Sequence, residues 1–313
     1  MKILVASPID PDAIEGLRGC HEVVCAFHQA DDTLRTLIKD CEVLVFRSGV
    51  DISADFMECA PDLKLLIRAG SGLDNLDVDY ARRRGLELAR IPQPGAQAVA
   101  EMSFALMLAL SRNLFEADRS MRQGRWAKHE LTGYLLKGKV LGIIGVGNIG
   151  TRVAEMGVSW GLEVIGCVEH HSAERVARLS QKSIRLLDFD EVIPAADYVS
   201  VHVPLKESTR NLINADVLSR MKTGSYLINL ARGGIVDEVA LHRELSNGGR
   251  LRGAALDVHK EEGEGKLSPL AGLSNVILTP HIGAMAVDVQ REIGRRILEI
   301  VDSFTARQHQ LAA

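Results

Sequence analysis

Three polar side chains in the second half of the sequence have the types that acid–base chemistry on a carboxylate-bearing molecule requires. They are Arg232, Glu262 and His281. A guanidinium can hold a carboxylate through two parallel hydrogen bonds, and an imidazole can deliver or remove a proton near neutral pH. A carboxylate hydrogen-bonded to the imidazole favours its protonated form. We therefore predict that Arg232 binds a carboxylate, that His281 moves a proton and that Glu262 supports His281.

Each of these residues follows a short apolar segment that is typical of a buried β-strand. The segments cover residues 226–230, 251–256 and 276–278. Ligands bind at the carboxyl ends of the strands in open α/β sheets, so we expect the three side chains to converge. Taken singly, each has an ordinary structural explanation, as a turn cap, a solvated acid or a loop histidine. The hypothesis therefore depends on a nucleotide site elsewhere in the chain.

A glycine-rich loop between a predicted strand (139–144) and a predicted helix (148–160) indicates such a site. The loop contains Gly145, Gly147, Asn148, Ile149 and Gly150. In a strand–turn–helix unit the first glycine permits the turn, the second lets the backbone approach a pyrophosphate, and the third lets helix and strand pack closely. The anion then binds free N–H groups at the helix N-terminus. The alternative is a plain glycine-rich turn.

The next predicted strand, 163–168, leads to an acid that would bind the adenosine ribose. Glu169 favours NAD, because a carboxylate repels the 2′-phosphate of NADP. His170, His171 and Arg175 follow it and leave NADP open, although the two histidines are equally consistent with a solvated loop. Since the nicotinamide itself carries the hydride, these sites together predict an oxidoreductase. It would move a hydride between a nicotinamide ring and a small 2-oxo or 2-hydroxy acid.

The elements that position these residues alternate between strand and helix along the whole chain, which predicts parallel sheets. In the first part, strands are expected at 2–7, 22–27, 43–46, 64–68 and 86–89, and helices at 33–40 and 78–84. A Pro/Gly-rich break at 91–95 and a long helix at about 97–123 then mark a boundary. The second part adds a strand at 198–201 and a closing helix at about 286–306. The fold class is therefore α/β, with two doubly wound parallel-sheet domains.

Composition limits the other classes of function. The 313 residues are 46% hydrophobic and 25% charged, with a net charge of −4, so nothing argues for nucleic acid as a partner. The densest apolar stretch, 104–110, is far shorter than the roughly 20 residues that span a bilayer, and the first residues read as a strand rather than a signal peptide. Five scattered cysteines fit a reduced, cytoplasmic protein, and no metal site is expected.

Several segments now resemble the D-2-hydroxyacid dehydrogenase family, most closely its 3-phosphoglycerate dehydrogenase branch. They lie over nearly the whole chain, at 68–75, 99–101, 121–126, 142–150, 202–205, 229–237, 254–258 and 278–284. The resemblance implies that Arg232, Glu262 and His281 are the catalytic residues. It also implies further cofactor contacts at His202, Val203, Pro204, Thr209, Ala231 and Asp257, where Asp257 would hold the nicotinamide carboxamide. Substrate contacts are implied at Arg47, Ser48, Ser71, Gly72 and Asn75, with Arg232 and His281.

The resemblance also implies a domain arrangement. A flavodoxin-like substrate domain would comprise 1–96 and 284–313, and a Rossmann dinucleotide-binding domain (97–283) would be inserted in it. Homodimers built through the cofactor domain are expected, and the appended regulatory domain of some phosphoglycerate dehydrogenases is expected to be absent. Arg47 would lie near a substrate phosphate, unless it is simply a surface arginine after a strand.

Departures from the family pattern leave the substrate open. Val168 stands where the family often has Asp, Gly263 replaces the usual Pro after Glu262, His259 replaces a Phe, and the loop 93–97 lacks the Asn of the phosphoglycerate branch. An NAD-sensing, corepressor-like binding protein and a dehydrogenase of another small anion such as phosphite remain alternatives. Formate is disfavoured, because the formate branch has Gln at the position of Glu262.

Overall fold

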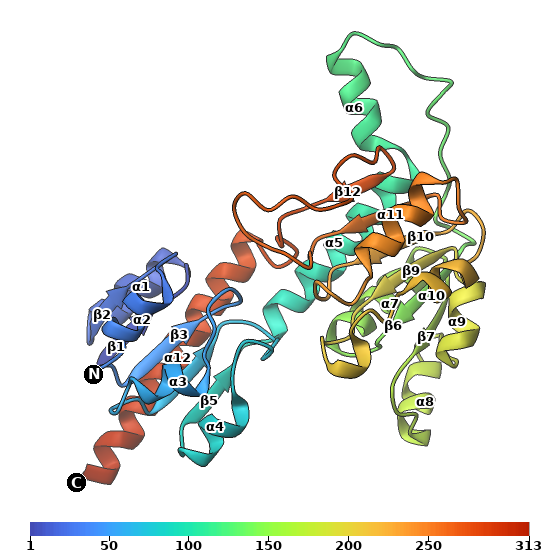
Figure 1. The fold of residues 1–313 in the computed structure, drawn as a ribbon. Helices are drawn as coiled ribbons and strands as arrows, with labels where there is room; N and C mark the ends of the chain where they lie inside the picture. Colours follow the sequence, from blue (N-terminus) through green and yellow to red (C-terminus); the bar gives the residue numbers. More distant parts are fainter. Residues whose placement is uncertain (313) are drawn as a thin grey trace. The chain divides into compact units, whose positions relative to one another are not determined.

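The chain folds into two compact units. A computed structural model describes residues 1–312, and the side chains of residues 1–310. The first unit comprises Met1–Gly95 and the chain from Met285 onward, and the second comprises Ala96–Ala284 (Figure 1). Each contains its own parallel sheet.

The first unit is built on five parallel strands. They are β1 (Lys2–Val5), β2 (Glu22–Cys25), β3 (Val43–Phe46), β4 (Leu65–Arg68) and β5 (Glu87–Arg90). Their order is β2-β1-β3-β4-β5, the doubly wound order of flavodoxin-like sheets. Strands β3 and β4 are buried along their whole length, whereas the edge strands β2 and β5 are partly exposed. This difference matches the continuous apolar runs that identify central strands in the sequence.

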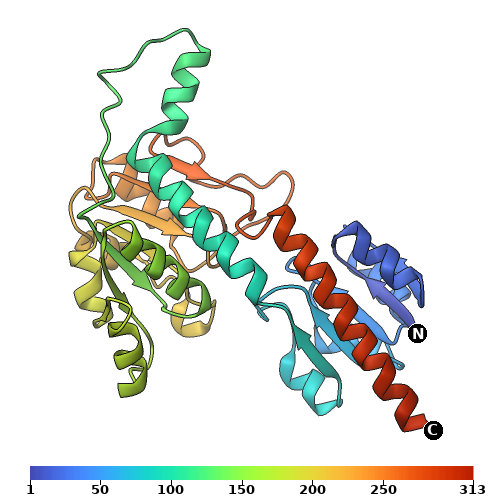
Figure 2. The same cartoon turned by 180° about the vertical axis from the view of Figure 1, so that it is seen from behind.

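Five helices belong to this unit. They are α1 (Pro11–Arg18), α2 (Asp31–Leu37), α3 (Ala54–Glu58), α4 (Val78–Arg83) and α12 (Val287–Ala312). The closing helix α12 extends beyond the expected end near residue 306 and crosses one face of the sheet (Figure 2). It packs closely on α1, as Gly294 shows: a Cβ at this position would lie only 2.9 Å from the Cβ of Ala13.

The second unit contains seven parallel strands. They are β6 (Val140–Ile144), β7 (Glu163–Cys167), β8 (Ile184–Leu186), β9 (Tyr198–Val201), β10 (Tyr226–Asn229), β11 (Gly253–Leu256) and β12 (Val276–Leu278). The strand order is β12-β11-β10-β9-β6-β7-β8. The chain adds β7 and β8 on one side of β6 and then continues with β9 on its other side, which makes a topological switch point between β6 and β9. The predicted fold class is confirmed. Of the strands, the sequence analysis missed β8 alone, whose three residues include an exposed arginine and form no clear apolar run.

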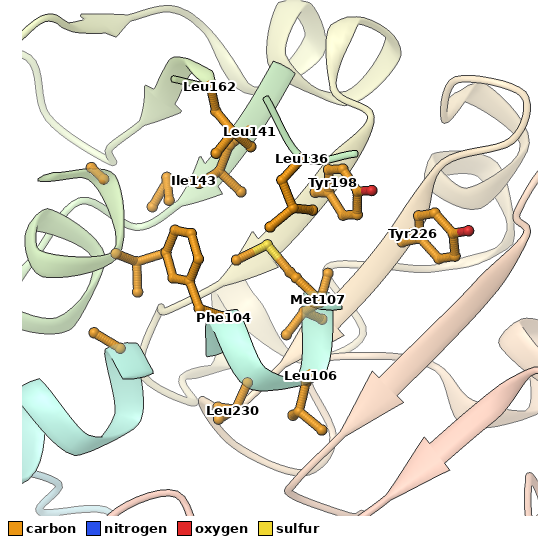
Figure 3. Close-up of a cluster of buried hydrophobic side chains, with 14 of the residues drawn as sticks. Phe104, Leu106, Met107, Leu136, Leu141, Ile143, Leu162, Tyr198, Tyr226 and Leu230 are labelled. Atoms are coloured by element: carbon orange, nitrogen blue, oxygen red, sulfur yellow. The ribbon is translucent and has the colours of Figure 1, made fainter. Parts of the chain in front are cut away.

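Helices cover this sheet. They are α5 (Gln93–Ser111), α6 (Leu114–Arg122), α7 (Asn148–Ser159), α8 (Ala173–Ser180), α9 (Phe189–Ala195), α10 (Ala215–Arg220) and α11 (Glu238–Ser246), with a short 3-10 helix at Glu207–Thr209. Side chains of α5 fill the core against β6 and β9. Phe104 and Met107 lie among Leu141, Ile143 and Tyr198 (Figure 3). The Tyr198 hydroxyl is satisfied there by a 2.8 Å hydrogen bond with Ser111.

The single helix expected at 97–123 is wrong in two respects. It begins earlier, at Gln93, because Pro94 is tolerated in a first turn, where its missing N–H has no partner to lose. It also breaks after Ser111, where Asn113 takes a left-handed conformation with φ of 53°, which asparagine tolerates better than most residues. Helices α5 and α6 therefore meet at 61°, and among the described residues no single helix is long and apolar enough to cross a membrane.

Candidate active site

The glycine-rich loop joins β6 to α7 with the geometry that the sequence predicts. Gly145 has φ of +98°, and a Cβ there would lie 2.9 Å from the backbone of His202. A Cβ at Gly150 would lie 2.2 Å from the Gly145 carbonyl oxygen, so helix and turn touch at this point. By contrast, a Cβ at Gly147 would meet no protein atom within 4 Å. Gly147 is also the N-cap of α7 and has no side-chain cap, so the open side of the loop fits a pyrophosphate on free N–H groups.

Charged groups gather after β7, where the ribose is expected. Glu169 is exposed and forms a 3.2 Å ion pair with Lys206, which comes from the loop after β9. Arg175, in the first turn of α8, donates a 3.1 Å hydrogen bond to the carbonyl oxygen of Val146 inside the glycine loop. The site therefore holds one carboxylate and two cations. The sequence analysis missed Lys206, because it is distant in sequence and belongs to no motif.

The loop after β9 closes one side of the glycine turn. The N–H of His202 bonds to Ile144 at 2.7 Å, and Val203 lies 2.8 Å from the Cβ position of Gly145. The Thr209 hydroxyl donates to the Pro204 carbonyl oxygen at 2.7 Å, which ties off the turn. Burial lowers the pKa of His202 to about 3, so its ring is neutral and pairs with the Ser200 hydroxyl at 2.8 Å.

Glu262 and His281 lie together after β11 and β12. The Nδ1 atom of His281 is 2.8 Å from Oε2 of Glu262, as the sequence analysis predicts. Burial alone would raise the pKa of Glu262, but the hydrogen bond and the charge of His281 outweigh it, so the pKa lies below its ordinary value. Because Nδ1 faces the carboxylate, Nε2 is the ring nitrogen that remains for a substrate.

Asp257 holds the turn that presents His281. This carboxylate is 1% exposed. Its oxygens accept hydrogen bonds from the Thr279 hydroxyl at 2.6 Å and from the N–H groups of Ile282 and Gly283 at 2.9 and 2.8 Å. His281 itself has φ of 56°, a strained conformation that persists where the surroundings enforce it. The structure thus gives Asp257 a local task besides the carboxamide contact that the resemblance implies.

Arg232 follows β10, in a loop that is held by local hydrogen bonds and by a close approach at Gly233. Its Nη1 donates to the Ala231 carbonyl oxygen at 2.6 Å, and the N–H of Ala231 bonds to Asn229 Oδ1 at 3.0 Å. A Cβ at Gly233 would lie only 1.7 Å from the carbonyl oxygen of His259. Only glycine allows this approach, so the Arg232 loop and the loop that carries Glu262 are packed directly together. The sequence pattern shows the glycine but not its neighbour.

A cavity lies beside the Glu262–His281 pair. It has a volume of 540 Å³ and is lined by residues of 259–271 and 278–281, including both members of the pair. The described residues contain no group of three or more His, Cys, Asp or Glu side chains that could hold a metal ion. The polar groups that face this cavity include the His281 imidazole and the Glu262 carboxylate.

Apart from Arg232 and His281, the predicted substrate residues lie in the first unit, in the loops after β3 and β4. Arg47 is half-buried, and its Nη1 donates to Gln290 Oε1 of α12 at 2.8 Å. Asn75 donates its amide to the Arg47 carbonyl oxygen at 3.0 Å, which joins the two loops. The carbonyl oxygens of Gly72 and Ser71 are held by Arg68 and Arg90. Ser48 and Ser71 are exposed beside them.

Comparisons with known proteins identify relatives of this chain. Residues 104–283 match the family described as D-isomer specific 2-hydroxyacid dehydrogenase, NAD binding domain. A hydroxypyruvate reductase of Thermotoga maritima is 38% identical over 301 residues, which cover 95% of this chain and 96% of that protein. A D-3-phosphoglycerate dehydrogenase of Methanocaldococcus jannaschii is also 38% identical, but the 299 matched residues cover 96% of this chain and only 56% of that protein.

Solved structures include one with the same fold. The D-lactate dehydrogenase of Aquifex aeolicus, complexed with NAD and lactic acid, superposes with a TM-score of 0.86 at 27% identity, over 99% of this chain and 97% of that one. The chain belongs to the D-isomer-specific 2-hydroxyacid dehydrogenase family. The predictions of this family, of an oxidoreductase and of a nicotinamide dinucleotide cofactor are thereby confirmed.

Proposed function

We propose that this chain transfers a hydride between the nicotinamide C4 atom and a small 2-oxo or 2-hydroxy acid, and that hydroxypyruvate or its 3-phosphate is the acid. The observation that carries the proposal is the 2.8 Å bond between His281 and Glu262 in a unit with a dinucleotide loop. The hydroxypyruvate reductase relative, which matches this chain over nearly all of its own length, supports the unphosphorylated acid. Arg47 supports an anionic distal group.

The residues divide the chemistry among them. When bound, the nicotinamide supplies or accepts the hydride. The guanidinium of Arg232 binds the substrate carboxylate through paired hydrogen bonds and so orients the 2-oxo carbon. The His281 imidazolium donates its Nε2 proton to the carbonyl oxygen as negative charge develops there, and takes the proton back in the reverse direction. Glu262 remains ionised beside the Nδ1 atom of His281 and stabilises the imidazolium. Asp257 keeps His281 in its strained turn.

The cofactor contacts follow the same proposal. The open face of Gly147 and the N–H groups of Asn148 and Ile149 would receive the pyrophosphate, and Gly145 and Gly150 would keep the turn closed behind it. Glu169 would accept the ribose hydroxyls once Lys206 is displaced. The remaining predicted contacts lie in the loops after β9 and β10, on the same edge of the sheet: His202, Val203, Pro204, Thr209 and Ala231.

We also propose a homodimer formed through the second unit. Helix α6 and the loop up to residue 136 project from the rest of this unit (Figure 1) and carry exposed apolar side chains, among them Phe115, Trp126 and Leu135. At its far end the loop is fastened by Tyr134, which accepts a 2.6 Å hydrogen bond from Arg252 and lies 4.3 Å below its guanidinium. An ordered apolar projection of this kind is typical of a surface that another chain covers.

A panel of 2-oxo acids tests the proposed reaction. Pyruvate, glyoxylate, hydroxypyruvate, 3-phosphohydroxypyruvate and 2-oxoglutarate would each be offered with NADH and with NADPH, and loss of the reduced nicotinamide absorbance followed. We expect hydroxypyruvate or its phosphate to be reduced far faster than the others. The variant Arg47→Ala, run beside the wild type, should lose the phosphorylated acid selectively. Tight dinucleotide binding without turnover of any acid would reject the enzyme and favour a dinucleotide-sensing protein.

A further inference from the structure

One buried carboxylate in the second unit has no place in the chemistry above. Glu238, the first residue of α11, is only 7% exposed. Burying a carboxylate is costly unless strong donors compensate for the lost water. A glutamate at the first position of a helix could remain in solvent and still interact with the helix dipole, so the burial of Glu238 calls for another explanation.

The helix end does not need Glu238 as a cap. Its neighbour Asp237 is the N-cap, and its carboxylate already accepts the N–H groups of Val239 and Ala240 at 3.1 and 3.0 Å. The carboxylate of Glu238 instead bonds outside its own helix. Oε1 accepts the backbone N–H of Lys260 at 2.6 Å, and Oε2 lies 3.5 Å from the Ser268 hydroxyl.

Both donors belong to the segment that carries Glu262. Between β11 and β12 the chain has no helix or strand of its own, and Gly263 and Gly265 take φ values of 124° and 76° within it. Glutamates 261, 262 and 264 in this stretch are exposed. A segment with so little regular structure depends on particular side chains to fix its course.

Lys260, whose N–H is anchored by Glu238, directly follows His259, which holds Glu262. The N–H of His259 donates to Glu262 Oε1 at 3.2 Å, and the His259 carbonyl oxygen abuts Gly233 in the Arg232 loop. Glu262 Oε2 in turn bonds His281 at 2.8 Å. A shift at Lys260 would therefore move His259 and weaken the contact between Glu262 and His281.

We propose that Glu238 is a positioning residue, which anchors the 259–268 segment so that Glu262 stays hydrogen-bonded to His281. The proposal deepens the proposed function and rests on it. Glu238 touches neither substrate nor cofactor in this scheme. It acts through the backbone of Lys260.

Three substitutions separate positioning from mere stabilisation. Glu238→Ala removes the acceptor, Glu238→Asp keeps the charge but withdraws the carboxylate by one methylene, and Glu238→Gln keeps both the reach and an oxygen for the Lys260 N–H. We expect kcat to fall roughly 10–100-fold in the Ala and Asp variants, the scale for misplacing a catalytic group by about 1 Å. The Gln variant should recover most of this loss. Arg243→Ala, which removes an exposed side chain from the last turn of α11, should behave as wild type.

A second readout needs no turnover. The ¹³C titration of the Glu262 carboxyl, assigned with Glu262→Gln, should show a midpoint below the ordinary range in wild type and in Glu238→Gln. In Glu238→Ala and Glu238→Asp the midpoint should rise, because the bond from His281 is weakened. Dinucleotide affinity should change less than about twofold. If Ala does not fold, the contrast between Asp and Gln decides.

An unchanged Glu262 midpoint in both Ala and Asp variants overturns the proposal, whatever happens to thermal stability. So does a loss of kcat that only follows the loss of folded protein. If the wild type reduces no 2-oxo acid, the proposed function fails, while the carboxyl titration still decides whether Glu238 positions Glu262.

Discussion

At the residue scale, the roles of the three polar residues follow from which atoms are already engaged. Nδ1 of His281 is held by Glu262, so the proposed mechanism leaves Nε2 for the substrate. The loop of Arg232 is packed against the loop of Glu262 through Gly233. The proposed cation for the carboxylate and the proposed acid for the carbonyl oxygen thus lie on neighbouring loops, and each assignment can be tested by one substitution.

Removing the guanidinium should abolish carboxylate binding. We expect Arg232→Ala to lower kcat/KM by an amount that corresponds to about 2–4 kcal/mol of lost transition-state stabilisation, the scale for losing charge-assisted hydrogen bonds. Arg232→Lys should recover part of this loss, because it restores the charge but not the paired geometry. Steady-state kinetics with the best acid of the panel measure the effect, and dinucleotide affinity serves as the control. Turnover within a few-fold of wild type would mean that another group binds the carboxylate.

The stability contributed by the Glu262–His281 pair should depend on pH in one direction. The folded pKa of Glu262 lies below its ordinary value of 4.5, so folding favours the ionised form. The contribution is fully present above the ordinary value and is lost as the pH falls through the lowered one. The difference in unfolding free energy between wild type and Glu262→Gln should therefore shrink as the pH falls from about 5 through the lowered pKa of Glu262.

Urea unfolding at a series of pH values measures this difference. Glu264→Gln, which removes the same charge from the same segment, is the matched control and should show no comparable dependence. A difference that grows as the pH falls below about 5 would contradict the assigned direction of the Glu262 pKa.

At the element scale, we expect two glycines of the same loop to affect different properties, Gly147 the binding of the dinucleotide and Gly150 the stability of the fold. Gly147 has room for a methyl group and an extended backbone conformation (φ −92°, ψ −151°), whereas Gly150 has none. We expect Gly147→Ala to leave the melting temperature without cofactor nearly unchanged but to weaken dinucleotide binding at least about tenfold, since the methyl group occupies the approach of the pyrophosphate. Gly150→Ala should instead destabilise the fold by about 1–3 kcal/mol, as overpacking does.

Thermal unfolding and a fluorescence titration with NADH give the two quantities. Equal dinucleotide affinity in Gly147→Ala and wild type would show that the pyrophosphate does not lie over this residue. The cofactor site would then have to be sought elsewhere on the loop.

Elements with a strong periodic pattern were predictable, and those set by a local exception were not. Buried parallel strands such as β3 and β9 are continuous apolar runs, and their side-chain pattern alone identifies them. The break at Asn113 depends on one residue adopting a left-handed conformation, which an apolar helical pattern does not reveal. The same holds for the site. His281 and Glu262 follow predictable strands, but the burial of Glu238 and the closeness of Gly233 to His259 depend on tertiary contacts.

At the scale of the whole molecule, we expect the two units to perform different tasks on similar sheets. The second presents the dinucleotide loop and the three polar residues at the carboxyl edge of its strands, and the first presents the Arg47 and Asn75 loops at the corresponding edge of its own. The sequence analysis assigned these tasks through motifs, because doubly wound sheets place ligands at that edge. The proposed homodimer would instead use α6 and the loop that follows it.

The projecting α6 segment should mediate that assembly. Phe115, Trp126 and Leu135 are 60%, 76% and 71% exposed, and a stable dimer must bury roughly 1,200–2,000 Å² in total. We expect wild type to sediment as a dimer and a double variant, Trp126→Ser with Leu135→Ser, to sediment as a monomer that still binds the dinucleotide. Leu267→Ser, which removes an apolar side chain that is 84% exposed outside this segment, should remain dimeric. A wild-type protein that is monomeric at micromolar concentration, or a double variant that is still dimeric, would show that α6 and its loop have another role.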